Sequence, residues 1–153
     1  MTFAPMSVEE MVATAMETTS SLLDGREVRV RLGRLPAVRA DRDFITKVLT
    51  NLIENATKYS AAGSPIFISA ERRGEMVSVS VADRGMGIDL SEQGLIFERF
   101  YRANAPGQKT SGTGMGLAIS RAIIEAHGGT LSVTSQLGEG SVFSFTLPVA
   151  NEL

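Results

Sequence analysis

The residues best suited to chemistry in this sequence are two asparagines and a lysine, Asn51, Asn55 and Lys58. They are spaced i, i+4 and i+7 in a run, residues 41–60, whose apolar positions recur at the period of an α-helix. They therefore share one margin of its buried face. Two carboxamides and an ammonium group there can bind a metal ion and a phosphate group, because metals take oxygen ligands and phosphate takes cations. The alternative is a solvated stripe in which Glu54 and Lys58 form an ordinary i,i+4 ion pair.

A carboxylate and two glycines, Asp83, Gly85 and Gly87, directly follow an alternating strand pattern. Glycines free the backbone to turn tightly, which leaves the carboxylate at the end of the strand. There it can accept a hydrogen bond from the exocyclic amine of a purine. The alternative is a turn aspartate that accepts from its own backbone.

Three alternating glycines, Gly112, Gly114 and Gly116, precede a predicted helix that continues to about Ala126. Glycines at a helix N-terminus let backbone N–H groups approach an anion closely, and the alternative is a flexible hinge. No Gly-Lys-Ser/Thr follows, so they are not a P-loop, and their spacing differs from the dinucleotide-binding fingerprint. The polar, aperiodic stretch from Ala103 to Thr113 is predicted to form a mobile loop.

Helical and strand patterns follow one another in an order that indicates the fold class. The first helix begins with the capping-box spacing of Ser7 and Glu10 and places Leu22 toward the core. The last helix places Ile119 there, and the alternation along the strand at 28–32 places Val30 there. Helices are predicted at 7–23, 41–60 and 112–126, and strands at 28–32, 66–71, 77–81, 131–133 and 142–147. Consecutive strand pairs between helices indicate an α+β domain with helices layered on a mixed sheet. There is no internal repeat, so residues 1–153 are predicted to be one domain.

The composition narrows the class of protein further. With 15 basic and 17 acidic residues the formal charge is −2, so no nucleic-acid partner and no direct membrane contact are expected. There is no cysteine, hence no disulfide or thiolate metal site. No apolar run approaches the ~20 residues of a membrane span, and the domain is predicted to be cytosolic. His127, the only histidine, is expected to contact the last carbonyls of its helix, and no catalytic role is assigned to it.

Taken together, four motifs occur in the order and spacing of the catalytic ATP-binding domain of sensor histidine kinases. Asn51-x-x-x-Asn55 resembles the asparagine box, Asp83-x-Gly-x-Gly87 the first glycine box, Phe97-Glu-Arg-Phe100 the phenylalanine box and Gly112-x-Gly-x-Gly116 the second glycine box. The resemblance covers about Ser7 to Pro148. It implies the Bergerat fold, a two-layer α/β sandwich with a mixed sheet of about five strands, helices on one face, and ATP between the helices and a mobile lid.

The resemblance also assigns roles to residues. Asn55 matches a magnesium ligand. The group that acts on the phosphates comprises Asn51, Lys58 and Arg102, the last reaching the γ-phosphate. Tyr59 matches an aromatic residue beside the adenine, and Asp83 matches the carboxylate that recognises the adenine amino group. The remaining nucleotide contacts are the adenine-pocket turn and the lid end: Gly85, Gly87, Ile88, Gly112, Thr113, Gly114, Met115, Gly116 and Leu117. The implied cofactors are ATP and Mg²⁺.

Several activities are compatible with this fold. Gyrase, one class of heat-shock chaperones and the mismatch-repair ATPases use a glutamate four residues before the magnesium-binding asparagine to activate water. Here that position is Asn51, which has no basic lone pair at neutral pH, so the sequence favours phosphoryl transfer over hydrolysis. A free-standing serine kinase acting on a regulatory protein, and a nucleotide-binding module without transfer activity, are the alternatives.

The phosphoacceptor is the part that the resemblance leaves unmatched. The family carries it as a histidine on a separate helix pair, and the helix from Ser7 to Leu23 contains no histidine. The chain is therefore predicted to be the catalytic half of a membrane-linked sensor. Its expected partners are the histidine-bearing dimerisation domain of the parent kinase and a downstream response regulator. The segment from Asn51 to Ser60 suggests the potassium- and turgor-sensing branch.

Overall fold

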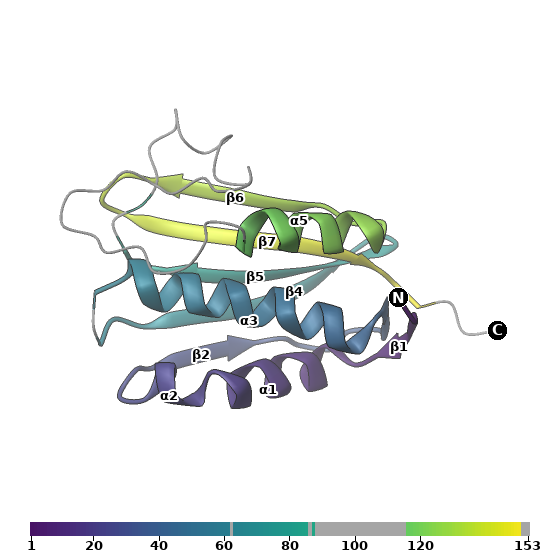
Figure 1. The fold of residues 1–153 in the computed structure, drawn as a ribbon, viewed down its shortest axis with the longest axis horizontal. Helices are drawn as coiled ribbons and strands as arrows, with labels where there is room; N and C mark the ends of the chain where they lie inside the picture. Colours follow the sequence, from purple (N-terminus) through teal and green to yellow (C-terminus); the bar gives the residue numbers. More distant parts are fainter. Residues whose placement is uncertain (62, 86, 88–115, 151–153) are drawn as a thin grey trace.

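The fold is a layer of helices packed on one face of a five-stranded sheet, as the computed structural model in Figure 1 shows. The structure describes residues 1–61, 63–85, 87 and 116–150. Its elements in chain order are β1 (Ala4–Met6), α1 (Val8–Thr18), α2 (Ser20–Leu23), β2 (Val28–Arg31), β3 (Val38–Ala40), α3 (Arg42–Tyr59), β4 (Ile66–Arg73), β5 (Met76–Asp83), α5 (Gly116–Ala126), β6 (Leu131–Gln136) and β7 (Gly140–Pro148).

The sheet is mixed, with the strand order β2-β4-β5-β7-β6. The edge strand β2 runs parallel to β4, and the other neighbours are antiparallel. The predicted α+β class, with a five-stranded mixed sheet and helices on one face, is confirmed. A second, two-stranded sheet of β1 and β3 was not predicted, because strands of three residues carry too little periodicity to identify.

Alternation along the strands separates a dry face from a polar face. Ile68, Val79 and Phe145 turn toward the helices and are buried. Apart from Phe67, their neighbours on the opposite face are hydroxyl side chains, of which Ser80 and Ser144 hydrogen-bond across β5 and β7 at 2.7 Å. The period of two in the sequence therefore places the core between the sheet and the helices.

Helix α3 occupies the middle of the helical layer (Figure 1). Asp41 caps it by accepting from the backbone N–H groups of Asp43 (3.1 Å) and Phe44 (3.2 Å), and the N–H of Thr2 reaches the same carboxylate at 2.6 Å. The N–H groups of Thr2 and then Phe44 hold the pKa of Asp41 below its ordinary value. The buried face comprises Ile45, Val48, Leu49, Leu52, Ile53 and Ala56. The predicted helix at 41–60 is confirmed to within one residue at each end.

Three predicted core positions are wrong. The first helix breaks at Thr19, whose hydroxyl donates back to the carbonyl of Ala15 at 2.8 Å, and this break leaves Leu22 47% exposed. Val30 is 42% exposed because β2 is an edge strand with a neighbour on one side only. Ile119 is 49% exposed, since α5 packs through Ser120, Ile123 and Ile124 instead.

His127 joins the end of α5 to the start of α3. It is 2% exposed; its Nδ1 lies 2.7 Å from the carbonyl of Ile123, and its Nε2 accepts from the backbone N–H of Asp41 at 3.0 Å. Because Nε2 accepts, the proton of the neutral ring is on Nδ1 and is donated to Ile123. The ring packs against Phe3 in a T-shaped arrangement, with centroids 4.9 Å apart. The predicted contact with the last carbonyls is confirmed, and the histidine is a structural connector.

We expect His127→Ala to lower the free energy of unfolding by about 3 kcal/mol, because it opens a cavity and leaves the buried N–H of Asp41 without its acceptor. Urea denaturation followed by circular dichroism measures the change. Glu125→Ala, two residues away in an exposed ion pair with Arg121, is the control and should cost no more than about 0.5 kcal/mol. Equal losses in the two variants would contradict the structural role of His127.

Candidate nucleotide-binding site

The polar stripe lies on the C-terminal half of α3. Asn51 and Asn55 are half-buried and Lys58 is exposed, as expected for the margin of an amphipathic helix. At 1.5 Å per residue, Asn51 and Asn55 are about 6 Å apart along the axis, and Tyr59 follows after another 6 Å. The helix therefore presents its two amides and an aromatic ring in a row about 12 Å long.

Asn51 lies against the first turn of α5. Its Nδ2 donates to the hydroxyl of Ser120 at 3.2 Å. A Cβ built on Gly116 would lie 2.6 Å from Asn51 Oδ1, closer than real Cβ atoms approach an oxygen. Glycine at position 116 thus lets the N-terminus of α5, the positive end of its dipole, lie directly on the amide of Asn51. A negatively charged group beside Asn51 would be favoured by that helix end.

Asp83 ends β5 in the middle of the sheet, between Ile66 of β4 and Ser141 of β7. It is 7% exposed, and its Oδ1 accepts from the backbone N–H of Gly85 at 2.8 Å. This bond is the local turn contact that was the alternative interpretation of the motif. It does not exhaust the carboxylate, which has about four lone-pair sites.

The turn after β5 lies against the backbone at the end of α3. A Cβ on Gly85 would lie 2.2 Å from the carbonyl oxygen of Tyr59 and 2.8 Å from Asp83 Oδ1. The turn after β5 therefore contacts the last turn of α3, and Tyr59 and Asp83 are brought to the same place. Gly87 is buried, with positive φ of 73°, close to the backbone of Gln136.

Burial raises the pKa of the Asp83 carboxyl above its ordinary value. The N–H groups of Gly85 and Ser141 and the positive charge of Arg26 act in the opposite direction without cancelling it. Ionised Asp83 is therefore a buried anion whose desolvation the protein offsets only in part. A donor supplied by a ligand would favour its charged form.

Two residues near this site belong to none of the four motifs. Ser120 interrupts the apolar face of α5, and a buried hydroxyl on such a face needs a partner; that signal could have indicated its contact with Asn51. Arg26 donates to Ser60 Oγ at 2.7 Å from the segment before β2, and nothing in the local sequence pattern indicates that contact.

Part of the predicted site lies outside the described residues. It comprises Ile88, the Phe97–Phe100 box, Arg102, the predicted loop at 103–113, and Gly112, Thr113, Gly114 and Met115. Asn51, Asn55, Lys58, Tyr59, Asp83, Gly85, Gly87, Gly116 and Leu117 are described, and the contacts above bring them to the C-terminal half of α3 and the ends of β5 and α5. No helix within the described ranges is long and apolar enough to cross a membrane.

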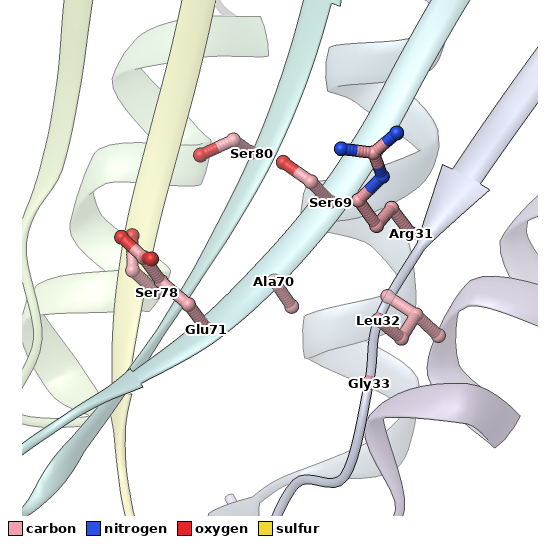
Figure 2. Close-up of a pocket in the computed structure, with 8 residues that line it drawn as sticks. All are labelled: Arg31, Leu32, Gly33, Ser69, Ala70, Glu71, Ser78 and Ser80. Carbon is pink, nitrogen blue, oxygen red and sulfur yellow. The ribbon is translucent and has the colours of Figure 1, made fainter.

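A separate hollow of about 340 Å³ lies at the polar face of the sheet (Figure 2). Arg31, Ser69 and Ser80 point into it beside Glu71 and Ser78. None of the motif residues that the structure describes lines it. It is therefore distinct from the site on α3.

Comparison with known proteins identifies the class to which this fold and site belong. Residues 40–151 match the family described as "Histidine kinase-, DNA gyrase B-, and HSP90-like ATPase". Because the match covers more than half of the chain, the protein belongs to this family. Within it, the chain is the catalytic ATP-binding domain of a histidine kinase, since its relatives are sensor kinases.

Three of these relatives show the extent of the similarity. The alginate biosynthesis sensor protein KinB of Pseudomonas aeruginosa is 42% identical over 123 residues, which is 80% of this chain and 20% of KinB. The sensor-like histidine kinase SenX3 of Mycobacterium tuberculosis is 36% identical over 150 residues, 96% of this chain and 37% of SenX3. The structure of full-length ShkA in complex with AMPPNP matches with a TM-score of 0.85 and 30% identity over 99% of this chain and 32% of ShkA. The chain thus spans a fifth to somewhat over a third of these proteins. The potassium- and turgor-sensing branch stays a prediction.

Proposed function

We propose that this domain binds Mg-ATP along α3 and transfers the γ-phosphate to a histidine on a separate dimerisation domain. The observation that carries the proposal is the position of Asn51, which lies against the N-terminus of α5 through Gly116 and Ser120. This is where a phosphate is favoured, and the side chain there is an amide that cannot take a proton from water.

The base of the nucleotide belongs at the other end of the row. Asp83 offers a buried acceptor to the adenine amine, and Tyr59 is held beside it by the contact of its carbonyl with Gly85. From Tyr59 to Asn51 the helix rises about 12 Å, so the phosphates extend from the Asp83 end toward α5.

The donor set fits Mg²⁺. Asn55 supplies one half-buried carboxamide oxygen, and Mg²⁺ is usually bound by one or two protein ligands together with substrate phosphates and water. The bound ion would neutralise charge on the phosphate oxygens. Lys58, on the same stripe, and Arg102 would add positive charge as the γ-phosphoryl group leaves, which is the main requirement of phosphoryl transfer.

The partners follow from the proposed reaction and from the kind of relative. ATP positioned without a general base needs an acceptor brought to it, which is the histidine-bearing domain of the parent kinase; a response regulator would then receive the phosphoryl group. The relatives carry sensor names, and this chain matches 20% of KinB and 37% of SenX3. We therefore propose that it is the cytoplasmic catalytic part of a membrane-linked sensor.

The isolated chain should bind Mg-ATP, hydrolyse it very slowly and not label itself. His127 is buried and accepts from the backbone N–H of Asp41. Asp41 precedes Asn55, the proposed metal ligand, by fourteen residues, so His127 lies about 21 Å from that ligand along the axis of α3. Transfer needs the nucleophile within about 3.5 Å of the phosphorus. Calorimetry tests binding, and radiolabelled ATP tests hydrolysis and labelling. Acid-labile label on the chain alone, or hydrolysis at several turnovers per second as in a dedicated enzyme, would overturn the proposal.

A further inference from the structure

Arg26 lies half-buried beneath the last turn of α3. Its guanidinium bonds with that turn and the segment after it: Nη1 donates to Ser60 Oγ (2.7 Å), Ser64 O (3.0 Å) and Ala61 O (3.3 Å), and Nη2 to Thr57 O (3.5 Å). Carbonyls at the end of a helix have no partner within it. The planar fork of Arg26 reaches one of them, the carbonyl of Thr57, and also binds the carbonyls of Ala61 and Ser64 in the segment after the helix. Arg26 therefore ties the last turn of α3 to the segment that follows it.

The turn fixed by Arg26 is the one that touches the adenine end of the proposed site. Tyr59 lies between Thr57 and Ser60, two of the residues that Arg26 binds, and its carbonyl rests against Gly85. Gly85 in turn donates to Asp83 Oδ1 at 2.8 Å. Displacement of the last turn of α3 would thus move the N–H of Gly85, which orients the Asp83 carboxylate.

The charge of Arg26 acts on Asp83 as well. It is one of the influences that lower the pKa of this carboxyl against the effect of burial. The distinction matters for recognition, because an ionised carboxylate only accepts hydrogen bonds whereas a protonated carboxyl also donates one. Adenine presents an amine, a donor, at the position where hypoxanthine presents a carbonyl, an acceptor.

We propose that Arg26 is a positioning residue that sets the nucleobase selectivity of this domain. It seats the end of α3 against Gly85, whose N–H orients the Asp83 carboxylate, so that the site prefers adenine to a base with a carbonyl at the same position. The inference rests on the proposed function, since it concerns the same nucleotide site. It adds a residue outside all four motifs to the determinants of specificity.

Affinities for Mg-ATP and Mg-ITP, measured by calorimetry, test the proposal in four proteins: the wild type, Arg26→Gln, Arg26→Lys and Arg29→Gln. Arg26→Gln loses the charge and the planar fork of donors. We expect the ratio of ATP to ITP affinity to fall about tenfold, mainly because the affinity for ATP falls. Arg26→Lys keeps the charge but not the fork, and we expect a fall of about threefold. Arg29, three residues further and in an exposed pair with Glu27, is the control and should leave both affinities unchanged.

The ratio separates selectivity from simple loss of structure. A purely structural role would lower the two affinities by the same factor, and that result, or unchanged affinities, would overturn the proposal. If Arg26→Gln does not fold, as circular dichroism would reveal, the same criterion applies to Arg26→Lys. In an Asp83→Asn background the Arg26 substitutions should no longer change the ratio; a persisting change would also overturn it. Failure of the wild type to bind Mg-ATP would instead contradict the proposed function.

Discussion

Asp83→Asn is expected to weaken Mg-ATP binding at least tenfold, about 1.4 kcal/mol. The carboxylate is buried at the end of the central strand β5, where a hydrogen bond to a charged acceptor is stronger than one to a neutral amide. The amide also presents a donor to the adenine amine as readily as an acceptor. Calorimetric titration with a non-hydrolysable ATP analogue measures the loss. Unchanged affinity would remove Asp83 from the adenine site.

The same substitution should not have a parallel effect on the stability of the ligand-free domain. Because burial raises the folded-state pKa of Asp83, its contribution to stability is fully present below the unfolded-state pKa and is lost as the pH rises through the folded-state value. At pH 7 the ionised carboxylate therefore destabilises the fold, and Asp83→Asn should not lower the free energy of unfolding. The free energy of unfolding of the wild type should rise relative to that of the variant as the pH falls toward about 4. A variant less stable at pH 7, with no change in this difference at lower pH, would contradict the assignment.

Gly85→Ala should impair both folding and nucleotide binding. The added Cβ would lie 2.2 Å from the carbonyl oxygen of Tyr59 and 2.9 Å from its carbonyl carbon, and these are backbone atoms of α3 that cannot rotate away. Separation of the turn from the helix should cost about 3 kcal/mol in the free energy of unfolding. It should also lower the ATP affinity more than tenfold, since it displaces the group that orients Asp83. Urea denaturation and calorimetry measure the two effects.

Gly74→Ala provides the matched control for this substitution. Gly74 lies in the hairpin between β4 and β5 with a positive φ of 63° and open space around its Cβ position. Alanine there meets only backbone strain, about 1 kcal/mol, and should leave ATP binding unchanged. If Gly85→Ala has no larger effect than Gly74→Ala, the contact between the turn and α3 does not support the site.

Periodicity in the sequence was sufficient for the elements that carry the site. The run around Asn51 has an apolar face of more than three turns and a cap at Asp41, so its helix was predictable nearly to the residue. The alternation of Val77, Val79 and Val81 likewise located β5 and the exit that Asp83 occupies. Long amphipathic elements reveal their buried face because their period repeats several times.

What the sequence could not reveal are contacts between segments distant along the chain. Arg26 reaches α3 more than thirty residues later, and His127 bonds to Asp41 across 86 positions. Such pairings depend on how elements pack, which local patterns do not encode. The exposed Ile119 has the same origin, since a helical period indicates an apolar face but not which of its members a neighbouring element covers.

Phosphoryl transfer in trans tests the central claim most directly. The isolated chain is mixed with candidate histidine-bearing helical dimerisation domains and radiolabelled Mg-ATP, and the label on each protein is compared after treatment with acid and with alkali. We expect label on the dimerisation domain only, labile to acid, and weak because the two proteins are not tethered. The same domain with its histidine replaced by glutamine should stay unlabelled. Acid-stable label on the partner, or acid-labile label on this chain in the absence of a partner, would contradict a histidine kinase that transfers to a separate domain.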